Sequence, residues 1–243
     1  MIVPRPEDAK HKNQMYRLLT QILSNSYLAR GLQFKGGTYA SLRGVLDRFS
    51  VDLDFDLPNK EDRQEARRQC YKIIETLGLT IKDESKEHLQ FFLKYQAKQF
   101  ERNTLKLEIS DDVSPYNIYE KVYLLEIGMY CSGYTLDTMF ANKLVAAKGR
   151  FNKTGKIASR DFYDIHKFFI EGLSVNKQVV EERTSLSYHK YLEDLIKFVT
   201  VELNEKVLYQ DLNPLMEKGS LDKVVKILKP ELLRFLKEAV LRG

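Results

Sequence analysis

The segment at residues 50–57, SVDLDFDL, constrains the fold of this chain more than any other. Apolar and acidic residues alternate strictly, so one side of an extended strand is apolar and the other carries Asp52, Asp54 and Asp56. Aspartate is a poor strand former, and neighbouring carboxylates repel one another. We therefore expect a half-buried strand whose acidic side holds a divalent metal ion at Asp52 and Asp54, with Asp56 as a solvated bystander.

A third carboxylate is available on another predicted strand, residues 103–110. There Leu105, Leu107 and Ile109 alternate with Lys106 and Glu108, so Glu108 is the candidate for completing a metal site. Sites with two metal ions hold them ~3.5–4 Å apart and are typical of phosphoryl transfer. A solvated outer face of an edge strand would also explain the aspartates, and that alternative stays open.

Two glycines precede the acidic strand. Gly36 and Gly37 allow backbone amides to approach phosphate oxygens closely, and Thr38 is expected to cap a short helix over residues 39–46. Together with Ser50, Gly36, Gly37 and Thr38 form a predicted binding site for a nucleoside triphosphate.

A second group of charged residues lies in the C-terminal half. Lys143 and Arg150 are seven residues apart on one predicted helix, and Asp161 and Asp164 share a face of the next, where Arg160 is spaced to pair with Asp164. A cation on one helix and carboxylates on the next could bind phosphates and orient a nucleophile. A purely structural ion pair explains the same spacing equally well.

The order of patterns predicts an α+β fold with a mixed sheet and flanking helices in residues 1–134, followed by an all-helical part in residues 135–243. The other predicted strands are residues 79–83, 88–95 and 117–127. A short extended piece is also predicted directly before Gly36. The predicted helices are residues 7–30, 39–46, 60–78, 135–151, 159–172, 185–203 and 230–243, the last with Pro230 in its first turn.

The bulk composition excludes several classes of protein. The 243 residues have a formal net charge of +5, which permits contact with nucleic acid, and the basic segment 148–160 is expected to be a loop that contacts a phosphate backbone. The two cysteines and the lack of a signal peptide or membrane span favour a cytoplasmic protein. P-loop, dinucleotide-binding, HExxH and GxSxG motifs are absent.

Together these motifs resemble the AbiEii/AbiGii group of nucleotidyltransferase toxins, within the DNA polymerase β-like superfamily. The resemblance covers roughly residues 30–170 and rests on the order FKGGTYASLRGVLDRFSVDLDF, LKLEI, ANKLVAAKGRF and SRDFYDIHKFF. It implies a nucleotidyltransferase core in residues 1–134 and a helical C-terminal domain. It also implies metal-dependent transfer of a nucleotide from an NTP, with tRNA as an acceptor in some members, and a separately encoded antitoxin. We expect the metal to be Mg²⁺ or Mn²⁺ and the acceptor to be RNA, at the 3′ end of tRNA.

The resemblance also assigns roles to residues. It places Gly36, Gly37 and Ser50 at the triphosphate, Asp52 and Asp54 at the metal, and the family's catalytic lysine and carboxylates at Lys143, Asp161 and Asp164. Asn142 departs from the pattern, because members of the family commonly have Glu before the lysine. The alternative function is therefore a non-catalytic module that binds RNA or protein on the same fold.

Overall fold

The computed structural model describes residues 1–99 and 101–242, apart from the side chain of Lys153. The chain forms two compact units, the first made of Met1–Val113 and Tyr119–Tyr134 and the second of Ser114–Ile118 and Thr135–Gly243. The boundary predicted after residue 134 coincides with the end of the first unit, but residues 114–118 pack with the second. Gly243, at the end of the last predicted helix, lies outside the described residues.

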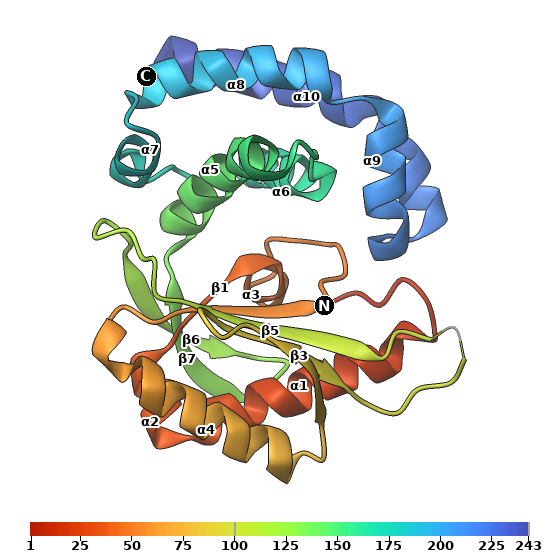
Figure 1. The fold of residues 1–243 in the computed structure, drawn as a ribbon. Coiled ribbons are helices and arrows are strands. Elements are labelled where there is room, and N and C mark those ends of the chain that lie inside the picture. Colours follow the sequence, from red (N-terminus) through yellow and green to blue (C-terminus); the bar gives the residue numbers. More distant parts are fainter. Residues whose placement is uncertain (100, 243) are drawn as a thin grey trace. The chain divides into compact units, whose positions relative to one another are not determined.

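A seven-stranded mixed sheet forms the centre of the first unit as far as it is described, in the order β3-β4-β5-β2-β1-β7-β6 (Figure 1). Strand β2 runs parallel to β5, and β1 runs parallel to β7, whereas the other neighbouring pairs are antiparallel. The strands are β1 (Gln33–Lys35), β2 (Asp52–Asp56), β3 (Thr80–Glu84), β4 (Leu89–Lys94), β5 (Thr104–Ser110), β6 (Tyr119–Leu124) and β7 (Met129–Tyr134).

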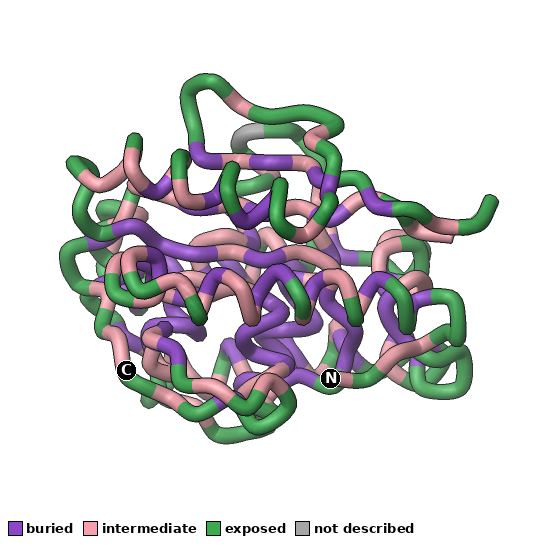
Figure 2. Tube along the Cα trace, turned by 90° about the horizontal axis from the view of Figure 1, so that it is seen from below, coloured by how far each residue is buried: buried purple, intermediate pink, exposed green. Residues whose placement is uncertain are grey.

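One face of this sheet is apolar because alternate residues of the strands share a side. Leu53, Phe55 and Phe34 are almost completely buried, and the Phe34 and Phe55 rings stack with centroids 4.7 Å apart. Helices α1 (Asp8–Ser24), α2 (Ser26–Gly31) and α4 (Arg63–Thr76) lie along one side of the sheet, with the short 3₁₀ helix Lys60–Asp62 before α4 (Figure 1). Figure 2 shows buried positions alternating with less buried ones along the chain.

The single helix predicted over residues 7–30 is wrong, because it is two helices. Asn25 adopts an extended conformation between them, and its side-chain oxygen accepts hydrogen bonds from the backbone N–H groups of Tyr27 and Leu28, both at 3.1 Å. An asparagine that caps a new helix in this way ends the preceding one.

Strand β7, whose sequence is MYCSGY, is absent from the sequence prediction. It forms the second arm of a hairpin whose first arm, β6, lies within the predicted strand at residues 117–127. Gly133 obscures the strand pattern, and its role is tertiary. A Cβ at this position would lie 2.6 Å from the Tyr39 ring and 2.7 Å from the Phe34 carbonyl oxygen. Glycine is therefore required here because β1 and helix α3 (Gly36–Leu42) pack directly against the strand.

The second unit is helical in its described residues. Its elements are α5 (Leu136–Thr154), α6 (Ser159–Ile170), α7 (Lys177–Thr184), α8 (Tyr188–Glu202), α9 (Glu205–Leu212), the 3₁₀ helix Asn213–Leu215 and α10 (Lys218–Arg242). Pro230 lies inside α10 rather than in a first turn, so that prediction is wrong.

The predicted loop at residues 148–160 is also mostly wrong. Helix α5 continues to Thr154 and ends where Gly155 takes a left-handed conformation, with φ of 66°. Both cysteines are free and buried, as expected. Among the described residues, no helix is long and apolar enough to span a bilayer.

Candidate active site

Asp52 and Asp54 lie on the polar side of β2, opposite the buried Leu53 and Phe55. The neighbouring strand β5 is parallel and in register, so that Asp52 pairs with Lys106 and Asp54 with Glu108. Burial raises the pKa of Asp54 to about 6, and the nearby Asp52 carboxylate adds to this shift. The site therefore holds a carboxylate whose charge is disfavoured until a cation compensates it.

Glu108 lies on the polar side of β5, as the alternation predicted, and the sheet register places it next to Asp54, but its carboxylate is engaged. Lys106 donates a hydrogen bond to its Oε2 atom, and Gln90 donates another at 3.2 Å. Burial acts to raise the pKa of Glu108, but these hydrogen bonds and the Lys106 charge outweigh it and the net shift is downward. Glu108 would have to exchange the lysine for a metal in order to act as a ligand.

Within the described residues, no group of three or more His, Cys, Asp or Glu side chains is arranged as a metal cluster. Mg²⁺, however, is usually bound by one or two carboxylates together with substrate phosphates and waters. Asp52 and Asp54 supply two hard oxygen donors on one side of one strand. This donor set fits a divalent ion that arrives with a nucleotide.

The glycine turn lies directly against these carboxylates. Gly36 has φ of 80°, and a Cβ on it would be only 2.4 Å from the Asp54 Oδ2 atom. A Cβ on Gly37 would be 2.8 Å from the Arg48 Nη2 atom and 2.9 Å from the Ser50 Oγ atom. Both glycines are needed because side chains from the β2 segment occupy the space next to them.

Thr38 and Ser50 are buried. Helix α3 begins at Gly36, so Thr38 lies inside the helix rather than capping it, and its hydroxyl donates a 2.6 Å hydrogen bond to the Asp52 carbonyl oxygen. This bond ties the glycine turn to the acidic strand. The Ser50 hydroxyl, in contrast, lies directly beside Gly37.

Arg48 belongs to this site and was missed from the sequence. It is buried, its guanidinium lies beside Gly37, and its Nη1 atom donates a 3.0 Å hydrogen bond to the Phe49 carbonyl oxygen. A charged residue directly before Phe49 and two positions before Ser50 was the available signal. Arginine supplies a permanent positive charge and several donors suited to phosphate.

Asp56 is not solvated, so the prediction of a bystander is wrong. Its side chain is 1% exposed and accepts hydrogen bonds from Lys35 at 2.5 Å, Tyr134 at 2.6 Å and Tyr119 at 3.1 Å. The alternation could not reveal this, because the partners come from three other strands. Asp56 thus joins β2 to β1, β7 and β6.

The charged residues of the second unit form a compact cluster. The Lys143 Nζ atom on α5 lies 3.0 Å from both Asp161 Oδ1 and Asp164 Oδ2 on α6. The Arg150 Nε atom lies 2.9 Å from Asp161 Oδ2. Lys143, rather than Arg160, pairs with Asp164, and the cluster combines one nearly buried lysine with two buried carboxylates.

Asn142, the departure from the family pattern, points to different partners. Its Nδ2 atom donates hydrogen bonds to Asn117 Oδ1 at 2.9 Å and to the Thr138 carbonyl oxygen at 3.0 Å. The Lys143 ammonium is paired with Asp161 and Asp164 rather than with residue 142. Asn142 instead fastens residues 114–118 to α5.

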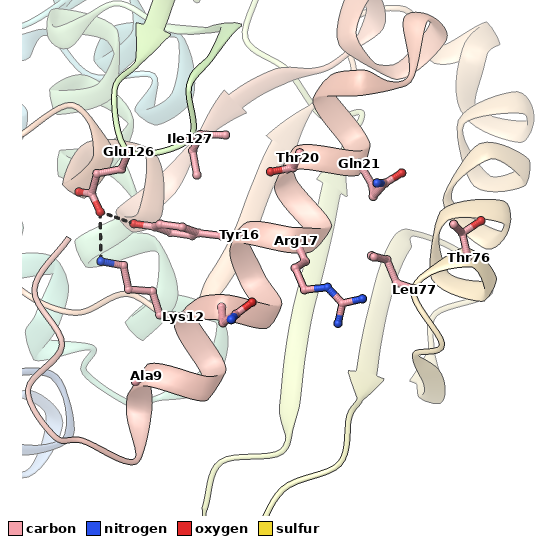
Figure 3. Close-up of a pocket in the computed structure, with 11 residues that line it drawn as sticks. Ala9, Lys12, Tyr16, Arg17, Thr20, Gln21, Thr76, Leu77, Glu126 and Ile127 are labelled. Atoms are coloured by element: carbon pink, nitrogen blue, oxygen red, sulfur yellow. Dashed lines mark hydrogen bonds and ion pairs between the residues drawn. The ribbon is translucent and has the colours of Figure 1, made fainter.

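The predicted residues thus form two groups, one in each unit. Asp52, Asp54 and Glu108 meet on the sheet of the first unit beside the glycine turn, and Lys143 meets Asp161 and Asp164 in the second. The first unit also has a groove of about 630 Å³ between α1, the end of α4 and the turn between β6 and β7 (Figure 3). None of the predicted site residues lines this groove.

Comparison with solved structures shows the fold of a nucleotidyltransferase. MenT4, a nucleotidyltransferase toxin from Mycobacterium tuberculosis, superposes with a TM-score of 0.58 at 17% identity, covering 96% of this chain and 89% of that one. JHP933 from Helicobacter pylori superposes with a TM-score of 0.55 at 20% identity, covering 98% of this chain and 96% of that one.

Residues 17–228 match the family model described as nucleotidyl transferase AbiEii toxin, type IV TA system. The chain belongs to this family and is a nucleotidyltransferase enzyme of the toxin class. Membership implies an NTP substrate and an antitoxin partner, and enzymes of this kind generally use divalent metal ions. A search of curated proteins finds no match.

Proposed function

We propose that this toxin uses Mg²⁺ or Mn²⁺ to transfer a nucleotide from an NTP to RNA, with the 3′ end of tRNA as acceptor. The observation that carries the proposal is the pair Asp52 and Asp54, two carboxylates on one side of β2, one of which has a pKa raised to about 6 by burial and by its neighbour. Divalent ions bound with a nucleotide would offset that repulsion.

The first unit binds the triphosphate in this proposal. Asp52 and Asp54 hold the metal, and Glu108 is the third carboxylate, which requires that it release Lys106. Backbone amides of Gly36 and Gly37 approach the phosphates. The Thr38 hydroxyl fixes this turn through its hydrogen bond to the Asp52 carbonyl oxygen, and the Ser50 hydroxyl lies beside Gly37. When bound there, the metal would supply charge stabilisation on the phosphates and would activate the attacking oxygen.

The second unit supplies the remaining groups. Lys143 stabilises negative charge on the phosphates, and Asp161 and Asp164 position its ammonium group or the acceptor hydroxyl. Catalysis of this kind depends on positioning and electrostatics rather than on a covalent intermediate. Both groups of residues are therefore required for transfer.

An RNA acceptor is supported by charge. The chain has a net charge of +5, and Lys156, in the loop before α6, is exposed. Phosphate contacts of this type give binding that weakens strongly as salt concentration rises.

The test uses the purified full chain with each α-labelled NTP, total RNA, and Mg²⁺ or Mn²⁺. The wild type is expected to label a discrete small RNA, and Asp52→Asn and Asp54→Asn are expected to abolish labelling while retaining the fold. Asp83→Asn is the matched control, because Asp83 is an exposed aspartate on edge strand β3.

Thermal unfolding with metal and NTP provides a second readout. A ligand at 100 times its Kd stabilises the wild type by about 2.7 kcal/mol, and this stabilisation should be absent in Asp52→Asn. Equal labelling by wild type and Asp52→Asn would refute the assignment of the metal site, and labelling confined to protein would refute the RNA acceptor.

A further inference from the structure

The hairpin of β6 and β7 displays two tyrosine rings and a lysine to solvent. Tyr123 and Tyr130 are directly opposite each other across the hairpin, 49% and 61% exposed, with ring centroids 5.1 Å apart. The Lys121 Nζ atom lies 5.0 Å from the centre of the Tyr130 ring. We refer to Lys121, Tyr123 and Tyr130 as the tyrosine platform.

Beyond their contact with each other and with Lys121, the fold gives the two rings no polar partner among the described residues. Within the part of the chain that is described, neither the Tyr123 nor the Tyr130 hydroxyl takes part in a hydrogen bond. By contrast, Tyr119 and Tyr134, four residues away along the two strands of the same hairpin, both donate to the buried Asp56. Because the two rings are adjacent and about half exposed, they form a contiguous apolar surface beside a charged group, which is the kind of surface that marks an interaction site.

The platform lies on the same side of the sheet as the catalytic carboxylates. On β6 and β7, Tyr123 and Tyr130 share a side with Tyr119 and Tyr134, because residues two apart and directly paired residues point the same way. The Tyr119 and Tyr134 hydroxyls reach Asp56, which shares a side of β2 with Asp52 and Asp54. One continuous polar side therefore joins the platform to the proposed metal site.

The sheet register gives the distance between the tyrosine platform and Asp54 of the proposed metal site. Lys35 pairs with Asp54, and Phe34 before it pairs with Gly133, so Tyr134 continues the row that contains Asp54. Tyr130 is four residues from Tyr134 along β7, or ~13 Å along the strands, and two strands from β2, or ~10 Å across them. Together these give a distance of roughly 16 Å from Tyr130 to Asp54. A few nucleotides of an extended strand would span this distance.

The hairpin is held in place by the first helix. Glu126, in the turn between β6 and β7, accepts a 2.7 Å hydrogen bond from the Tyr16 hydroxyl and lies 3.1 Å from the Lys12 ammonium (Figure 3). Both partners are on α1, which packs on the sheet. The platform is therefore a fixed surface rather than a mobile loop tip.

We propose that the tyrosine platform binds unpaired bases of the acceptor RNA and guides its end toward Asp52 and Asp54, an inference that rests on the proposed function. Exposed aromatic side chains on a sheet are a common way to bind single-stranded RNA, since every base can stack on them. Lys121 adds a positive charge suited to the phosphate backbone. Continuity with the catalytic side and this lysine favour RNA over a protein partner.

The experiment compares the wild type with Tyr123→Ala/Tyr130→Ala and Tyr123→Phe/Tyr130→Phe. Loss of stacking of one base is expected to weaken binding of total tRNA roughly 5- to 150-fold in the alanine variant. The phenylalanine variant, which keeps the ring faces, should bind within about threefold of the wild type, since stacking needs only the ring faces. Tyr209→Ala, on α9, is the matched control for removing an exposed tyrosine.

Stabilisation by NTP and metal should be the same in all four proteins, which shows that the fold and the triphosphate site are intact. Wild-type labelling of RNA with unchanged RNA affinity in the alanine variant would overturn the platform and leave the proposed function standing. Loss of binding in the phenylalanine variant would also overturn it, because hydroxyl contacts rather than stacking would be responsible. If the wild type labels and binds no RNA, the acceptor assignment and the platform are both refuted.

Discussion

Replacing Lys143 by methionine should destabilise the second unit strongly. The Lys143 side chain is 13% exposed, and its ammonium lies 3.0 Å from two carboxylates whose side chains are 1% and 0% exposed. Removing one partner of a buried ion pair costs about 3–5 kcal/mol, because the remaining charge stays buried. For a chain of this size, that cost corresponds to a decrease in Tm of roughly 6–20 °C.

The assay is thermal and urea unfolding followed by circular dichroism at pH 7. Lys148→Met is the matched control, because Lys148 is on the same helix and its ion pair with Asp194, at 3.9 Å, is partly exposed and should be worth at most about 1 kcal/mol. The double variant Lys143→Met/Asp164→Asn should be more stable than Lys143→Met, because it also removes a buried charge. A Lys143→Met protein within about 1 kcal/mol of the wild type would refute this reasoning.

Two further predictions concern the first unit. Gly36→Ala and Gly44→Ala should each lower the free energy of unfolding by about 1–2 kcal/mol, because both glycines have left-handed backbones. Only Gly36→Ala, whose Cβ would meet the Asp54 carboxylate, should also lose nucleotide transfer. Equal transfer rates in the two variants would contradict the proposed geometry. His11 is buried, and burial lowers its pKa to about 4. Between pH 6.5 and pH 4 the unfolded chain therefore takes up a proton that the folded chain does not, so the free energy of unfolding should fall by about 3 kcal/mol as the pH is lowered. Urea titrations of the wild type and His11→Gln should differ in this pH range, and parallel curves would show that His11 is not the group responsible.

The sequence alone was sufficient for the local features that follow from periodicity. The alternation in residues 50–57 defined β2 and its acidic side, and the apolar spacing of residues 103–110 placed Glu108 on the polar side of a strand that proved to lie beside it. The three-residue spacing of Asp161 and Asp164 put both carboxylates on one face of α6, where they meet Lys143. These inferences succeeded because side-chain direction in a helix or strand is fixed by the backbone.

The tertiary structure decided everything that depends on partners distant in the chain. Asp56 has the same local pattern as Asp52 and Asp54, yet Lys35, Tyr119 and Tyr134 bury it in a hydrogen-bonded cluster. Arg48 became a site residue only when the chain folded it against Gly37. The residue type determines which groups an aspartate or arginine can bind. Long-range packing determines which of those groups lie within reach, because contacts between distant segments are not encoded in local periodicity.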